Sequence, residues 1–141
     1  MSRRLDLLAL AVVLAGCAAA QSPDQAAAFP AGTRFAWLGT DSGGARRNAP
    51  ADPTRYTIAF EPSGRATLRL DCNRGSAQWT RDGAKLALSP VAATKMMCAH
   101  GSLDAAYASD LSQVDSWRVE REELVLSGRD GSTMRFRALP D

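Results

Sequence analysis

The chain has 141 residues, with 17 basic and 15 acidic side chains, one histidine and three cysteines, and a formal net charge of +2. This length is that of one domain of ordinary size, which argues against a multidomain enzyme and against a polytopic membrane protein. The charge balance lacks the clustered basic excess of a nucleic-acid-binding protein, and three cysteines are too few for a disulfide-dense scaffold.

Residues 1–16 have the pattern of a signal peptide. Arg3 and Arg4 precede an apolar stretch over residues 7–14. This stretch is much shorter than the roughly 20 apolar residues of a membrane-spanning helix, and its length suits the core of an export signal. The general secretory route is expected, and the paired arginines leave the twin-arginine route open as an alternative.

Cys17 ends the tetrapeptide Leu-Ala-Gly-Cys, which resembles the lipobox of bacterial lipoproteins. The cysteine of a lipobox receives the lipid, so we expect Cys17 to anchor the mature chain to a membrane. Ala18 follows it, where an aspartate would favour retention at the inner membrane, so the expected location is the periplasmic face of the outer membrane. The alternative is an ordinary signal peptide cleaved at a later alanine, with an incidental Cys17. Residues 17–32 are small, polar and punctuated by proline, and we expect them to form a flexible tether.

Most of residues 33–141 alternate apolar and polar side chains, which is the period of half-buried strands. Turn signals such as Glu61-Pro-Ser-Gly64 and Asp82-Gly83 separate these strands. The polar segment 40–53 contains no large apolar residue and is expected to be a mobile loop. The expected strands are 34–38, 56–60, 65–70, 77–80, 85–88, 117–119, 124–126 and 134–138.

One segment has the helical period instead. Ser102 can cap a helix, and the apolar residues that follow it recur at helical spacing. They are Leu103, Tyr107, Leu111 and Val114, with Asp104, Ala108 and Gln113 on the outer face. The fold class is therefore α+β. We expect a small curved antiparallel β-sheet or open barrel of about seven to eight strands, with one α-helix over about residues 102–113.

Four arginines occupy outward positions of the expected strands: Arg65, Arg69, Arg135 and Arg137. The simplest interpretation is a solvated face. If their strands were neighbours, the four would form a basic stripe that could meet an acidic partner or lipopolysaccharide phosphates.

Two segments, 71–76 and 94–99, resemble the signature segments of the META/HslJ-like domain, which read approximately G-C-N-x-x-S-G and T-x-M-x-C. Here they read Asp-Cys-Asn-Arg-Gly-Ser and Thr-Lys-Met-Met-Cys-Ala, with Asp71 in place of the usual glycine and Gly75 in place of an aromatic residue. The resemblance covers residues 33–141. It implies a small α+β domain, often on an envelope lipoprotein, with no catalytic residues and with links to stress tolerance, secretion or motility. The motif residues that it marks in this chain are Asn73, Arg74, Thr94 and Met96.

The two cysteines of the body allow three interpretations. Cys72 continues the inward series of the strand before it, and in an oxidising periplasm a Cys72–Cys98 disulfide is favoured. The first alternative is a pair of reduced, buried thiols. The second is a copper or zinc site, because Met96, Met97 and His100 surround Cys98 with soft ligands. We expect no metal or other cofactor.

Enzyme chemistry finds little support in the sequence. His100 is the only imidazole, and a Cys98–His100 nucleophilic pair would be lost on disulfide formation. Asn73 follows the cysteine at a tight turn, where asparagine commonly supports the bend, and this structural role is favoured over ligand contact.

These observations together predict a non-enzymatic, monomeric, lipid-anchored envelope protein. It would serve stress resistance or envelope integrity by presenting a surface or loop to another envelope component. Two other functions stay open, a small-ligand or metal-binding lipoprotein and a proteinaceous inhibitor of a cell-wall hydrolase. A deep apolar cavity would favour the ligand-binding protein, and a filled core with one ordered protruding loop would favour the inhibitor.

Overall fold

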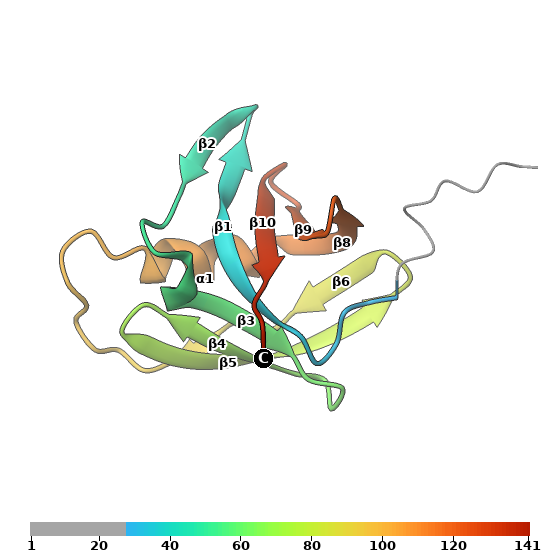
Figure 1. The fold of residues 1–141 in the computed structure, drawn as a ribbon, viewed down its shortest axis with the longest axis horizontal. Helices are drawn as coiled ribbons and strands as arrows, with labels where there is room; N and C mark the ends of the chain where they lie inside the picture. Colours follow the sequence, from blue (N-terminus) through green and yellow to red (C-terminus); the bar gives the residue numbers. More distant parts are fainter. Residues whose placement is uncertain (1–27) are drawn as a thin grey trace, which may run out of the picture.

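The computed structural model describes residues 28–141. The barrel strands of this part of the chain are β1 (Arg34–Ser42), β3 (Tyr56–Phe60), β4 (Arg65–Leu70), β5 (Asn73–Asp82), β6 (Lys85–Leu88), β8 (Val114–Glu120), β9 (Glu123–Gly128) and β10 (Thr133–Ala138). These eight antiparallel strands form the described barrel in the order β1–β3–β4–β5–β6–β8–β9–β10, and β10 pairs back with β1 (Figure 1). Two short strands, β2 (Ala45–Asn48) and β7 (Ala92–Ala93), pair with β1 and β5. The predicted α+β class with an antiparallel barrel is confirmed.

Alternation places one face of each strand inside the barrel. In the β3–β4 hairpin, Ile58 pairs with Leu68 and Phe60 pairs with Ala66, and all four side chains are buried. The interior is packed with aromatic and aliphatic side chains, so the strands are held together by apolar burial as well as by their backbone ladder. The largest fully buried side chains include Trp37, Tyr107, Phe60, Phe136, Ile58 and Leu70.

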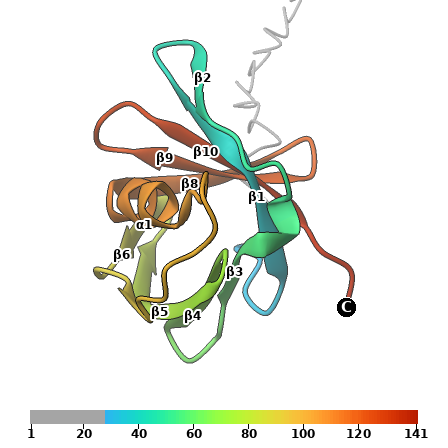
Figure 2. The ribbon, with the colours of Figure 1, turned by 90° about the vertical axis from the view of Figure 1, so that its left-hand side faces the viewer.

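The helix α1 (Asp104–Ser112) lies at one end of the barrel, with the strands arranged around it in the end-on view of Figure 2. It inserts Tyr107 and Leu111 into the core, as the helical spacing predicts. The Tyr107 ring stacks on Trp37 with centroids 4.8 Å apart. The helix begins two residues later than predicted, because Ser102 does not act as the N-cap. Its hydroxyl instead accepts a bond from the Asp104 N–H at 3.3 Å.

Phe29 packs against the opposite end of the barrel. Its ring centroid lies 5.1 Å from Phe60 and 4.9 Å from both Trp79 and Trp117. The Gly32 N–H donates to the Phe60 carbonyl at 2.8 Å. The prediction of a flexible tether over residues 17–32 is therefore wrong for its last residues, because an aromatic side chain gains more by covering the exposed core than by remaining in water. The signal peptide, Cys17 and the start of the tether lie outside the described residues.

The segment expected to be a mobile loop, 40–53, is largely ordered secondary structure, and that prediction is wrong. β1 runs on to Ser42, turns at two glycines and returns as β2, and a short 3₁₀ helix follows at Pro53–Arg55. Polar contacts hold this hairpin in place of apolar ones. Arg46 pairs with Asp41 at 2.7 Å, and β2 also bonds to a carboxylate of α1.

The strands of the four outward arginines are not neighbours. β3 and β1 separate β4 from β10, so Arg65 and Arg69 do not form a stripe with Arg135 and Arg137. Arg135 is moreover engaged by carboxylates, since its guanidinium lies 3.3 Å from Glu123. The condition for the basic stripe is not met.

Replacing Tyr107 by phenylalanine should raise the free energy of unfolding by about 1 kcal/mol, because the phenolic oxygen is fully buried and has no hydrogen-bond partner within residues 28–141. Burial also raises the pKa of Tyr107 well above its ordinary value. The contribution of Tyr107 to the stability of the wild type should therefore be constant below about pH 10 and fall above it, as the unfolded chain releases a proton that the folded chain keeps. Urea unfolding at pH 8 and near pH 11 should show a smaller alkaline loss in Tyr107→Phe, by about 1 kcal/mol. An equal loss in both proteins would contradict the assignment.

Candidate functional site

Cys72 and Cys98 form a disulfide with their Cα atoms 5.5 Å apart, which confirms the favoured pairing. The two alternatives that need free thiols are wrong for this structure. The expectation that Cys72 continues the inward series of β4 is also wrong. Leu70 pairs with Asn73 across the hairpin, so Asp71 and Cys72 form its two-residue turn and the alternation ends at Leu70. Asp71 is buried there, and Cys72 is half-buried at the surface of the turn.

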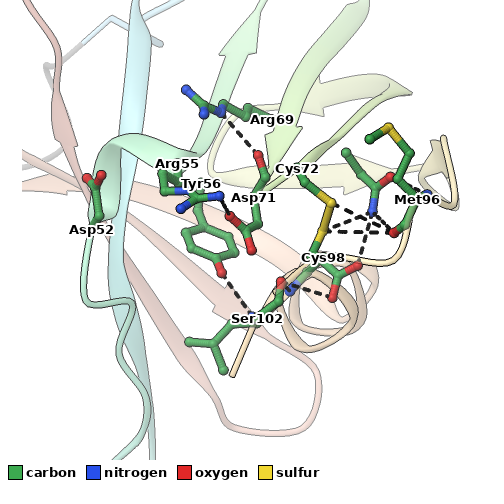
Figure 3. A network of polar contacts seen from close by, with 12 residues as sticks. Asp52, Arg55, Tyr56, Arg69, Asp71, Cys72, Met96, Cys98 and Ser102 are labelled. Atoms are coloured by element: carbon green, nitrogen blue, oxygen red, sulfur yellow. Dashed lines mark hydrogen bonds and ion pairs between the residues drawn. A yellow bond between two sulfur atoms is a disulfide. The ribbon is translucent and has the colours of Figure 1, made fainter. Parts of the chain in front are cut away.

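Asp71 adopts a positive φ of 59°. This left-handed conformation favours glycine, and aspartate is among the few other residues that tolerate it. The position is the one where the related motif carries glycine, so the backbone geometry explains the substitution. The aspartate adds an ion pair, because its carboxylate lies 2.5 Å from the Arg55 guanidinium (Figure 3).

Asn73 joins the second signature segment to the first. Its carbonyl oxygen accepts from the Thr94 hydroxyl at 2.9 Å and from the Met96 N–H at 2.8 Å. Its amide nitrogen donates to the Met96 carbonyl at 3.1 Å and to the Asp104 carboxylate at 3.2 Å. Asn73 is buried, so these bonds satisfy an amide that would otherwise be costly to bury. The residue has a structural role, as predicted, but it supports a segment 20 or more residues away instead of its own turn.

Gly75 allows β7 to approach β5. A Cβ atom at this position would lie 3.0 Å from the Ala92 carbonyl oxygen and 3.1 Å from the Val91 side chain. Such contacts are tight for a methyl group, so a larger side chain here would require β7 to shift, and glycine fits where an aromatic residue stands in the related motif. Directly after β7, the Thr94 N–H donates to the Arg74 carbonyl at 3.0 Å, which fixes the start of the next segment.

The structure thus brings all the predicted body residues together: Cys72, Asn73, Arg74, Thr94, Met96 and Cys98. They hold the irregular segment 94–103, which we call the clamped loop. Two large apolar side chains are exposed among the described residues, and both belong to the clamped loop. Met96 is 63% exposed and Met97 is 100% exposed. An ordered loop with two solvent-facing methionines is a surface that suits contact with another molecule.

A cavity of about 310 Å³ lies beside the clamped loop, between it and residues 49–55. Its lining combines apolar residues with polar and charged ones, and the latter include Asp52, Arg55, Asp71, His100 and Ser102. Bonds from the Thr54 hydroxyl and then from its backbone N–H hold the pKa of Asp52 below its ordinary value, so this carboxylate is ionised at neutral pH. The cavity can therefore receive a polar or charged side chain of a partner.

The side chains considered for a copper or zinc site are not arranged as metal ligands. The disulfide removes both thiolates, and Met97 points into solvent. No cluster of three or more His, Cys, Asp or Glu side chains within residues 28–141 is placed to hold a metal ion. In the same range, no helix is long and apolar enough to cross a membrane.

A comparison with known protein families matches residues 33–141 to the META domain. The chain belongs to the META domain family. The predicted resemblance is therefore confirmed, and the clamped loop is a feature of this META domain. A comparison with curated protein sequences finds no significant match.

Two solved structures are similar to this META domain. An NMR structure of a protein from Burkholderia xenovorans has a TM-score of 0.65 and 23% identity, over 86% of this chain and 99% of that chain. A crystal structure of a DUF4847 family protein from Bacteroides vulgatus ATCC 8482 has a TM-score of 0.54 and 13% identity, over 76% of this chain and 92% of that chain. At these identities, the likeness shows the fold alone.

Two residues at the site of this META domain were missed by sequence analysis. Arg55 neutralises Asp71, and Asp104 binds the amide of Asn73. Asp104 was expected on the outer face of the helix. Its position two residues after Ser102, in the first turn, was the signal that it contributes to the local polar network.

Proposed function

We propose that this META domain is a non-enzymatic, lipid-anchored envelope protein that binds a protein partner through the clamped loop, in the service of envelope integrity or stress resistance. One observation carries the proposal. Met97 is fully exposed at the centre of a loop that a disulfide and a buried asparagine hold in place. Exposing a methionine on a held loop prepares a contact at little cost in conformational entropy, which is what a recognition surface requires.

The position of the clamped loop supports its presentation away from a membrane. β3 runs from Tyr56, whose hydroxyl accepts from the Leu103 N–H, to Phe60, which contacts Phe29. The clamped loop and Phe29 therefore lie at opposite ends of the barrel. Figure 1 shows the start of the described chain, in blue, on the side away from the orange segment before α1. Cys17 precedes Phe29 by 12 residues. A lipid on Cys17 would hold the Phe29 end of the barrel nearer the bilayer and leave the clamped loop facing the periplasm.

The chemistry of the loop supports binding over catalysis. Cys98, the strongest nucleophile in the segment, is consumed by the disulfide. Both polar atoms of the Asn73 amide are occupied by the chain itself. These groups hold a surface in shape and are not free to act on a substrate.

Site-specific photocrosslinking in intact cells tests the proposal. A photoreactive residue at position 97, in the full chain with Cys17 retained, should yield one discrete adduct with an envelope protein. The matched control places the same residue at Ala87, which is exposed on β6, and should not yield it. No adduct at position 97, or the same adducts at both positions, would reject the clamped loop as the interface. Metabolic labelling with an alkyne fatty acid tests the anchor separately, since label should enter the wild type and not Cys17→Ser.

A second candidate function is inhibition of a cell-wall hydrolase, and the packed barrel with an ordered exposed loop favours it over binding a small ligand inside the barrel. In this case the clamped loop would enter the active-site cleft of the hydrolase. The purified protein should slow the lysis of peptidoglycan by envelope extracts, and Met97→Asp should relieve the inhibition. Lysis at the same rate with and without the protein would remove this candidate.

A further inference from the structure

A second surface lies on the outer wall of the barrel and reaches the start of the clamped loop at Arg74. A groove of about 550 Å³ runs over the outward faces of β3 and β4. Its charged and hydroxyl lining residues are Arg34, Arg69, Arg74, Thr54, Thr57 and Thr67. The groove has three guanidinium groups on its walls, and no carboxylate of the described chain lines it. It is not the stripe considered from the sequence, since Arg34 and Arg74 replace Arg135 and Arg137.

The register of the sheet places two of these charges face to face. Arg69 and Arg74 are directly opposite each other on β4 and β5. Like charges at directly opposed positions of a sheet destabilise it. No Asp or Glu side chain within residues 28–141 forms an ion pair with Arg34, Arg69 or Arg74.

Some arginines elsewhere on the barrel are paired with carboxylates. Arg46, Arg118 and Arg135 each have a carboxylate within 4.0 Å. Other exposed arginines, such as Arg121 and Arg137, have no ion pair within residues 28–141 either. What distinguishes the groove is that three guanidinium groups share it and no carboxylate of the described chain lines it. A groove lined by charge of one sign attracts counter-ions, so this concentration of guanidinium groups favours a bound anion.

The groove also has the donors and the space that an oxyanion needs. Thr57 on β3 stands opposite Arg69 on β4, and Thr67 on β4 stands opposite Ser76 on β5. Hydroxyl groups therefore lie beside the guanidinium groups. Ala59 lines the groove with only a methyl group, which leaves it open. The Nε of Arg69 donates to the Asp71 carbonyl at 3.2 Å, and this bond orients the guanidinium while its two terminal nitrogens can meet a ligand.

We propose that this groove binds a phosphate group. Guanidinium groups pair with phosphate through parallel hydrogen bonds of high strength, and threonine hydroxyls complete the shell of donors. The groove is larger than a phosphate ion, so it has room for the glycerol or sugar to which a phosphate is attached. The same chemistry is offered by a free phosphate compound and by the headgroup of an anionic lipid.

Isothermal titration of the purified full chain carrying Cys17→Ser, which removes the lipid, separates the two sources. The probes are glycerol 3-phosphate and the water-soluble dihexanoyl phosphatidylglycerol. Binding of the first alone identifies a free phosphate compound as the ligand, and binding of the second alone identifies a lipid headgroup. Binding of both supports the phosphate site with either source. No heat from either probe at millimolar concentration overturns the proposal.

Two variants assign the binding to the groove. Arg74→Gln should weaken the affinity by about tenfold, because it removes one charge-assisted contact. Arg74 is exposed and its side chain makes no hydrogen bond to residues 28–141, so this variant should fold. The matched control, Lys85→Gln with Arg121→Gln, removes two charges from exposed positions outside the groove and should leave the affinity within about twofold. Equal weakening by the control would show a non-specific charge effect and overturn the assignment.

Discussion

Replacing Cys72 and Cys98 together by serine is expected to lower the free energy of unfolding by about 3.5 kcal/mol at 25 °C. The two cysteines are separated by 26 residues in the sequence. In the chain-entropy model, a cross-link over this length removes that much conformational freedom from the unfolded chain. Urea denaturation of the oxidised wild type and of the double variant measures the difference directly.

The wild type treated with a reductant serves as the control for this change. It should unfold at the same urea concentration as the double variant, because both lack the covalent bond. The reduced loop keeps the hydrogen bonds of Asn73, so the folded state should survive and hydrogen exchange should quicken first at residues 94–101. Equal stability of the oxidised wild type and the double variant would show that Asn73 and the packing alone hold the clamped loop.

Alternation predicted most of the fold because it is a property of neighbouring residues. The inward positions of β3 and β4, and those of Tyr107 and Leu111 in α1, follow from periods of two and of 3.6 that are read within one segment. The closure of β10 on β1 does not follow in this way. It joins Trp37 to Phe136, nearly 100 residues apart, and depends on the shape of the whole sheet.

Alternation failed where the backbone changes direction. The inward series of β4 predicted a buried Cys72, but the chain turns after Leu70 because Asp71 takes a positive φ. An aspartate followed by a cysteine does not by itself indicate a left-handed backbone conformation at the aspartate. The glycine in the related motif was the signal, since glycine is the residue that left-handed backbone favours.

The residues of the candidate site were recognised through the motif, and their partners were not. Asn73, Thr94 and Met96 belong to the signature segments, whereas Arg55 and Asp104 lie outside them and are brought in by the fold. The packing of Phe29 was not predicted for a related reason. It stands in a segment of small and polar residues, and its place is decided by an opening between Trp79 and Trp117 that exists only in the folded barrel.

Asp110 is the clearest case of a residue whose role is fixed by distant partners. It lies in the last turns of α1 and is only 5% exposed. Its carboxylate accepts from the Thr40 hydroxyl at 2.6 Å and from the Asn48 amide at 3.1 Å, and it pairs with Arg47. These partners precede it by 62 to 70 residues. Asp110 therefore joins the helix to β1 and β2.

Replacing Asp110 by alanine should lower the free energy of unfolding by about 3 kcal/mol. Removing one partner of a buried ion pair costs about 3–5 kcal/mol, and the partial exposure of Arg47 places the loss at the lower end of that range. The buried Thr40 hydroxyl and the Asn48 amide would lose an acceptor at the same time. Urea denaturation measures the loss, and Asp115→Ala, at an exposed position of β8, should change the stability by less than about 0.5 kcal/mol.

A double-mutant cycle distinguishes the contact from a general effect on the helix. If Thr40 acts through Asp110, the losses caused by Thr40→Val and Asp110→Ala should overlap, with a coupling of about 1 kcal/mol between the two positions. Hydrogen exchange should also quicken in β2, which among the strands of residues 28–141 pairs with β1 alone. Additive losses, or exchange that quickens equally in β2 and in β4, would show that Asp110 stabilises the helix by itself. The contacts of Asp110 with Thr40, Arg47 and Asn48 would then make no separate contribution to the free energy of unfolding.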